Sequence, residues 1–241
     1  TTGKKKIVVA AVLASLMMQQ TTVIHAAIPE GYTTRSQSAI AIGTGSTTVP
    51  DAGAPVNQNA VAIGKIAKAN TTKSVAIGSD SVATGWVQGN NQDVEAATAI
   101  GAHANAIGRG ASALGHGAKA TGTGTLALGS NTVTGANGAT AVGSYASATS
   151  ENSIAIGGSA TSAVTDAAKA RAAAAIAIGK SADASGVSAT AIGDGVTADA
   201  TAAIGIGNNG TKATGYGATA IGRNAKVTAE KSVALGFDLN V

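Results

Sequence analysis

Residues 65–78 read KIAKANTTKSVAIG, and the Ala-Ile-Gly that ends this stretch returns along the whole chain. Ile, Leu or Val precedes the closing glycine in every copy, and Ala stands two positions before it except that Gly205 precedes Gly207. Eight of the twelve intervals between closing glycines are 14 residues and one is 15, while the other three are 21, 22 and 23. A repeat this short and regular predicts a solenoid, in which each unit packs only on its neighbours. The predicted turn glycines are Gly43, Gly64, Gly78, Gly101, Gly115, Gly129, Gly143, Gly157, Gly179, Gly193, Gly207, Gly222 and Gly236.

The residues before each glycine alternate as a β-strand does. In SVAIG, residues 74–78, the side chains of Val75 and Ile77 point one way and those of Ser74 and Ala76 the other. The glycine then allows a turn with positive φ, and a second glycine often follows seven residues later, at positions 85, 108, 122 and 186. Each unit of 14 residues is therefore predicted to form two strand–turn halves. We expect an all-β chain in which single coils stack into a flat, narrow, parallel β-roll.

The composition is that of a thin core. The chain has 241 residues, of which 33 are Gly, 2% are aromatic and 12% are charged. With so few aromatic side chains, single aliphatics and alanines must supply the apolar volume. We expect the Val/Ile face to fill the roll and the flat Ala face to be free for contact between subunits. Because one coil buries little apolar surface for the residues it orders, we infer that copies of the chain assemble.

The N-terminal residues have the order of a secretory signal peptide. Residues 4–26 read KKKIVVAAVLASLMMQQTTVIHA: three lysines, an apolar run of 12 residues over 7–18, then polar and small residues. The alternative is a retained membrane anchor, but a spanning helix needs roughly 20 apolar residues. We predict a signal peptide over residues 1–26 with cleavage after Ala26, and therefore an exported protein.

Charge and cysteine content exclude several classes of function. Removal of the leader and its three lysines leaves 13 Lys and Arg against 12 Asp and Glu, and these charges are scattered along the sequence. Nucleic-acid binding needs clustered cations, so no nucleic-acid partner is predicted. The chain has no cysteine, which excludes disulfides and thiolate metal sites.

The repeats resemble a known family. SVAIGSDSVATG (74–85), the Ala-Ile-Gly repeats over 98–108, NSIAIGGSA (152–160) and KSVALG (231–236) resemble the head repeats of trimeric autotransporter adhesins, the YadA-like group. The resemblance covers about residues 38–236. It implies a left-handed parallel β-roll assembled as a homotrimer, which binds a host extracellular-matrix protein or cell-surface ligand. It also implies a place at the cell surface or outer membrane of a Gram-negative-type bacterium, or secretion.

The expected organisation follows from the leader and the resemblance. It consists of a signal peptide over 1–26, an N-terminal lead-in over 27–37 and a head roll over 38–241. Family members continue into a neck, a coiled-coil stalk and a membrane barrel segment, whereas FDLNV ends this sequence five residues after Gly236. Neither heptads nor amphipathic strands of ten residues occur in it. We expect no stalk or membrane anchor in this chain, which is then either a piece of a longer protein or a secreted head.

Three long intervals interrupt the repeat, and loops on rigid scaffolds often carry function. Residues 44–60 contain Pro50 and Pro55 and form either an exposed tip loop or an irregular first coil. Residues 158–175 have high helix propensity from Ala167 to Ala175 and are predicted to form a local bulge or one helical turn. Residues 79–97 hold the only tryptophan, which either anchors a ligand or covers the open side of an expanded coil. The candidate ligand contacts there are Trp86, Asn90, Asn91 and Asp93, beside Glu95.

No motif for catalysis, a cofactor or a metal emerges. His103 and His116 are 13 residues apart, nearly one coil, so they can lie on adjacent coils; without a third ligand they are interpreted as solvated turn residues. The aspartates at 80, 183, 194 and 199 do not match the calcium-binding roll pattern. The chain is therefore predicted not to be an enzyme, since acyltransferase β-helices need six-residue strands in threes. Rival functions are a structural spacer without a ligand and an ice-binding surface, although the Thr column that ice binding needs is interrupted.

Overall fold

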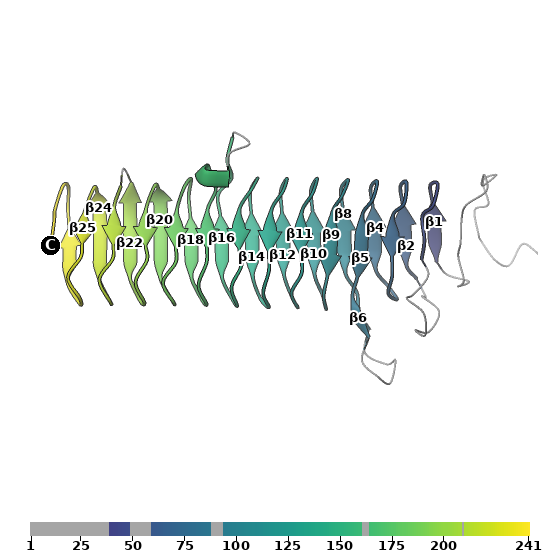
Figure 1. The fold of residues 1–241 in the computed structure, drawn as a ribbon, viewed down its shortest axis with the longest axis horizontal. Coiled ribbons are helices and arrows are strands. Elements are labelled where there is room, and N and C mark those ends of the chain that lie inside the picture. Colours follow the sequence, from purple (N-terminus) through teal and green to yellow (C-terminus); the bar gives the residue numbers. More distant parts are fainter. Residues whose placement is uncertain (1–38, 49–58, 88–93, 161–163, 209) are drawn as a thin grey trace, which may run out of the picture. The chain divides into compact units, whose positions relative to one another are not determined.

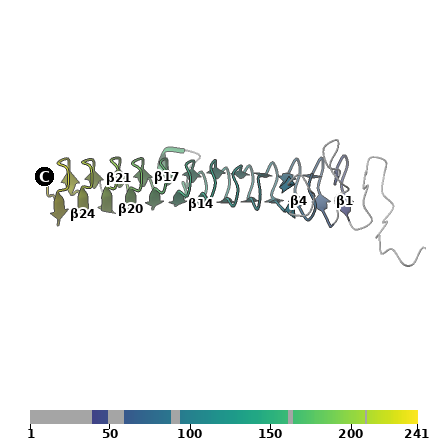
Figure 2. The same cartoon turned by 90° about the horizontal axis from the view of Figure 1, so that it is seen from below.

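A computed structural model describes residues 39–48, 59–87, 94–160, 164–208 and 210–241, all within the unit Gly31–Val241. The predicted signal peptide (1–26) and lead-in (27–37) lie outside these residues. Within them, short strands stack coil upon coil along one axis (Figure 1), and the view turned by 90° shows them in two layers (Figure 2). Among the described helices, none is long and apolar enough to cross a membrane.

One layer is a 13-stranded parallel sheet, here called the aliphatic sheet. It is formed by the residues that precede the thirteen repeat glycines. Its strands, in spatial order, are β1 (Ile40–Ile42), β2 (Val61–Ile63), β4 (Val75–Ile77), β8 (Thr98–Ile100), β10 (Ser112–Leu114), β12 (Leu126–Leu128), β14 (Thr140–Val142), β16 (Ile154–Ile156), β18 (Ile176–Ile178), β20 (Thr190–Asp194), β22 (Ile204–Asn208), β24 (Thr219–Arg223) and β26 (Val233–Leu235).

The other layer is an 11-stranded parallel sheet, here called the polar sheet. Its strands lie in the second half of each repeat and are shorter. They are β3 (Lys68–Ala69), β5 (Val82–Thr84), β9 (Asn105–Ile107), β11 (Lys119–Ala120), β13 (Val133–Thr134), β15 (Ser147–Ala148), β17 (Lys169–Ala170), β19 (Asp183–Ala184), β21 (Thr197–Ala198), β23 (Lys212–Ala213) and β25 (Lys226–Val227).

Equivalent residues of successive repeats stack directly on one another. Ala113 pairs with Ala99 on one side and Ala127 on the other, and the same register holds for their neighbours. Between the layers the chain makes a tight turn: the Ala118 amide donates to the Gly115 carbonyl over 3.3 Å. Two short strands and two such turns account for the 14-residue period. The predicted parallel β-solenoid is therefore confirmed.

The prediction that the Val/Ile face fills the roll is wrong. Ala113 is 0% exposed and points inward, whereas Ile100 and Leu128, at the outward positions, are 38% and 42% exposed. Because the turns are so tight, the two layers lie too close for branched side chains, and methyl groups fill the space. The polar sheet supplies the same residue type from its side, for example Ala106. The alanines thus form the core, and the aliphatic side chains form an outer face.

Inward hydroxyls complete this core without leaving their donors unused. Ser81, Thr125 and Ser153 are buried, and each donates to the carbonyl of the residue three positions earlier, at distances of 2.6 to 2.9 Å. A hydroxyl bonded back to its own turn is as small as the site requires and stays hydrogen-bonded, which is the condition for burying a polar group.

The exception at Gly205 has a steric explanation. Val196, which occupies a position filled by Ala in the two preceding coils (Ala168 and Ala182), is fully buried. A Cβ at Gly205 would lie 2.8 Å from the Val196 Cγ1 atom, closer than real Cβ contacts. The missing methyl at one position therefore makes room for the larger side chain at the other.

This pair predicts a compensating double substitution. Gly205→Ala should lower the free energy of unfolding by ~1–2 kcal/mol, because overpacking of a filled core has a cost of this size. Val196→Ala should largely remove that cost when combined with Gly205→Ala, restoring the Ala–Ala pairing of the other coils. Denaturant unfolding of the two single variants and the double variant measures the coupling; additive effects would contradict the steric explanation.

Candidate interaction surfaces

The outward face of the aliphatic sheet is a continuous apolar surface. One column of it consists entirely of Ile, Leu and Val, and the neighbouring column mixes aliphatics with Thr and Ser. The uniform column is Ile42, Ile63, Ile77, Ile100, Leu114, Leu128, Val142, Ile156, Ile178, Ile192, Ile206, Ile221 and Leu235. The mixed column is Ile40, Val61, Val75, Thr98, Ser112, Leu126, Thr140, Ile154, Ile176, Thr190, Ile204, Thr219 and Val233. Apolar patches beyond a few hundred Å² mark interaction surfaces on soluble proteins.

The outward face of the polar sheet is hydrophilic and carries a column of lysines. Strand register places Lys68, Lys119, Lys169, Lys212 and Lys226 in one column, separated by other residues except between the last two. Beside the column, the Arg171 guanidinium forms an ion pair with the Asp183 carboxylate. The charges are scattered in the sequence, so the prediction did not find this column. Alignment of the repeats on their glycines would have shown it, since three of the lysines stand four residues after a repeat glycine.

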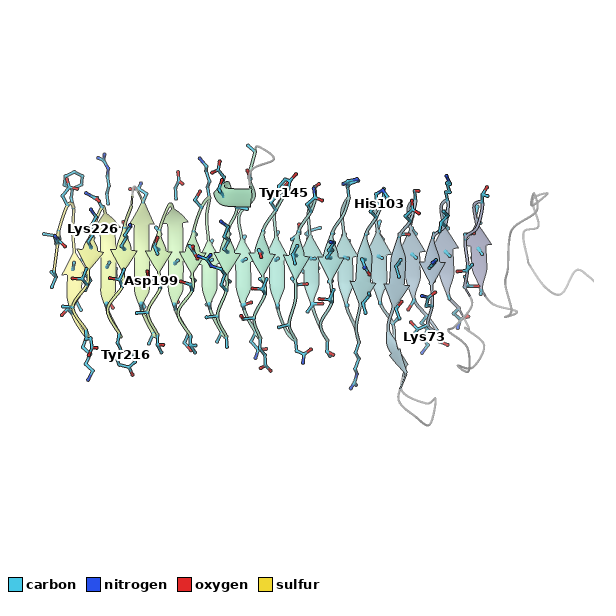
Figure 3. The ribbon with its side chains drawn as sticks, viewed as in Figure 1. Lys73, His103, Tyr145, Asp199, Tyr216 and Lys226 are labelled. Carbon is cyan, nitrogen blue, oxygen red and sulfur yellow. The ribbon has the colours of Figure 1, made fainter. Side chains whose placement is uncertain are left out.

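The turns form the two edges of the roll. We call the edge formed by the turns that start at the repeat glycines the glycine edge; His103 and Tyr145 lie on it, and Lys73 and Tyr216 lie on the opposite edge (Figure 3). All thirteen repeat glycines have φ between +119° and +153°, a region that side chains rarely adopt. Several other turn residues, such as Ile66 and Tyr145, hold left-handed φ near +60°.

The predicted contact residues around Trp86 lie partly outside the described chain. Trp86 and Val87 form β6, and Val94 and Glu95 form β7; the two pair antiparallel and interrupt the parallel stack. In Figure 1, β6 points away from the edge of the roll. Asn90, Asn91 and Asp93 lie outside the described residues. The insertion is therefore a short hairpin base rather than a widened coil.

The other two insertions differ in how far they are described. Pro50 and Pro55 of the first lie outside the described residues. In the third, a single 3-10 turn, η2 (Val164–Asp166), is the one helical turn that was expected. The helix propensity of Ala167–Ala175 is overridden, because Lys169 and Ala170 pair with Ser147 and Ala148 to continue the polar sheet.

The two histidines meet, as their spacing allowed. His103 and His116 lie on the glycine edge in consecutive coils, and their ring centroids are 5.7 Å apart with the rings at 84°. Among the described residues, no group of three or more His, Cys, Asp or Glu could hold a metal ion.

Comparison with known proteins gives the same fold. The family model of the YadA head domain repeat, which spans two copies of the repeat, matches residues 57–81, 106–132, 135–160, 170–195 and 213–238. No curated protein matches the chain. The matched segments cover more than half of the sequence and contain both strands of the coil, the tight turns and the repeat glycines. The chain belongs to the YadA head-domain family, whose fold is that of a structural adhesin domain and not of an enzyme.

Proposed function

We propose that this chain is the head of a trimeric surface adhesin, in which the aliphatic sheets of three copies face one another. The observation that carries the proposal is the apolar face on one side of the roll, with the lysine column on the other. Burying Ile, Leu and Val side chains against other copies stabilises the assembly by about 25 cal/mol per Å² of apolar surface. The narrow alanine core leaves few other sources of hydrophobic stabilisation. The left-handed coil and the trimer follow the family.

The polar sheet and the edges then face outward. Three copies side by side repeat every outward side chain three times, so that weak contacts add through effective concentration. We propose that these surfaces, with the hairpin at Trp86 as a further candidate, bind a host extracellular-matrix protein or cell-surface ligand. The signal peptide over 1–26 would deliver the chain for display on the cell surface or for secretion.

Solution mass tests the assembly. We expect residues 27–241 to have three times the chain mass by light scattering after gel filtration. The variant Ile100→Asp, Leu128→Asp, Ile156→Asp places three carboxylates on the apolar face and should reduce the mass to that of one chain, because burying unpaired charges is costly. The matched control, Asn105→Asp, Lys119→Asp, Ser147→Asp, places carboxylates on the polar sheet and should remain trimeric. A monomeric parent, or dissociation of the control instead, would contradict the proposed interface.

A spacer without a ligand is the second candidate function, and the near-identical coils favour it. Deletion of two complete coils, residues 116–143, keeps the register and shortens the roll. An adhesin whose contacts lie along the polar sheet should lose binding to immobilised matrix proteins or host cells in proportion. Unchanged binding after this deletion, together with loss on removal of another segment, would assign the roll as a spacer.

A further inference from the structure

Two imidazoles occupy neighbouring positions on the glycine edge. His116 is the first residue after Gly115, and His103 is the second after Gly101. The strands before them, β8 and β10, pair in register with Ile100 opposite Leu114, so the two turns lie one above the other. Both side chains are exposed, and Figure 3 shows His103 pointing away from the roll.

The backbone that carries these rings is held by hydrogen bonds between coils. The His103 amide donates to the Ser79 carbonyl over 2.8 Å, and the Gly117 amide donates to the Ala102 carbonyl over 2.9 Å. Each turn is also closed on itself, because the Ala104 amide donates to the Gly101 carbonyl and the Ala118 amide to the Gly115 carbonyl. Side-chain rotation alone is therefore needed to change how the two rings meet.

The separation of the rings matches the geometry of two ligands on one metal ion. Imidazole nitrogens bind Zn²⁺ at about 2.0–2.1 Å, which places two ring centres about 5 Å apart when the ligands are arranged tetrahedrally. The observed separation is 5.7 Å with the rings at 84°. A small rotation of two exposed rings is sufficient to direct one nitrogen of each toward a common point.

The surroundings favour a cation and leave the remaining coordination positions open. Asp80 stands one coil before His103 at the equivalent place in its turn, so a carboxylate lies on the same edge. Its Oδ2 accepts a hydrogen bond from the Ser79 hydroxyl. The described residues do not bring three ligands together, which distinguishes this pair from a closed structural zinc site.

We propose that His103 and His116 form a two-histidine site for a divalent transition metal, such as Zn²⁺, Ni²⁺ or Cu²⁺. Imidazole is a preferred ligand of these ions, and an open site completes its coordination with water or with a donor from another molecule. The site depends on the stacking of consecutive coils, not on the proposed adhesin function.

Metal titration of the untagged full chain tests this site. With Zn²⁺ as the probe, calorimetry should give one ion per chain. Loss of even an outer-shell partner weakens metal binding by 10–100-fold, so His103→Asn or His116→Asn should weaken it by about tenfold or more. Asn suits position 103 because it tolerates the left-handed φ of 58° there. His25→Asn, which removes the third histidine of the sequence, is the matched control and should bind as the parent does.

A relocated histidine separates pairing from histidine content. In His116→Asn, Ser130→His the second histidine moves one coil further, because Leu114 pairs with Leu128, and its backbone then lies about 10 Å from that of His103. This variant should not regain Zn²⁺ binding. With Cu²⁺, electron paramagnetic resonance of the parent should show two coordinating nitrogens. Unchanged affinity in both single variants, full binding by the relocated variant, or one nitrogen in the spectrum would each overturn the proposal.

Discussion

Replacing Gly115 with Ala is expected to lower the free energy of unfolding by about 3 kcal/mol or more per chain. The residue has φ of +136°, where a side chain is strained whatever the space around it. The added Cβ would lie 2.4 Å from the carbonyl oxygen of Gly129 and 2.6 Å from its carbonyl carbon. Both contacts are with backbone atoms of the next coil, which cannot move without breaking the stack.

Gly124 supplies the control for this substitution. It stands in the next turn with φ of +62°, is exposed, and has no atom within 4 Å of the place that an added Cβ would take. Gly124→Ala should therefore cost only the left-handed penalty, ~1 kcal/mol. Denaturant unfolding of both variants, with hydrogen exchange to locate the weakened coil, measures the difference. Equal losses would show that the close approach of stacked coils does not determine the glycine at position 115.

The second large effect is expected on the inner face of β10. Ala113 is 0% exposed and has alanines above and below it in the same sheet. Ala113→Leu should lower the free energy of unfolding by about 3 kcal/mol, since a filled core tolerates added methylenes poorly. The roll has no wider space to receive them, because tight turns hold its two layers together.

Ser112→Leu is the neighbouring control and tests the orientation of the whole strand. Ser112 points outward and pairs with Leu126 in the next strand, so leucine is already present in its column. We expect its unfolding free energy to change by no more than about 0.5 kcal/mol. Circular dichroism during denaturant unfolding, with the solution mass of each variant, measures both effects. A stable Ala113→Leu chain and a disrupted Ser112→Leu chain would reverse the assignment of inner and outer faces.

The candidate surfaces were predictable to different degrees. The spacing of His103 and His116 was enough to predict adjacent coils, because strand register repeats with the period. The lysine column was not found, because Lys68, Lys119 and Lys169 are far apart in the sequence and insertions shift their intervals. The helix propensity of Ala167–Ala175 was also misleading, since pairing with the neighbouring coil outweighs a local preference of a few tenths of a kcal/mol per residue.

The sequence by itself determined the solenoid, its 14-residue period, the two strands of each coil and the positions of the turn glycines. Periodicity is sufficient for these, because equivalent residues of a stacked repeat must occupy equivalent places. Only the tertiary structure decided which face of the strand is inside. Alternation shows that Ala76 and Ile77 lie on opposite faces, but not which of them faces the core. The spacing between the layers decides that, and turns closed by a single hydrogen bond, as from Ala118 to Gly115, leave room for a methyl group and place the larger aliphatics outside.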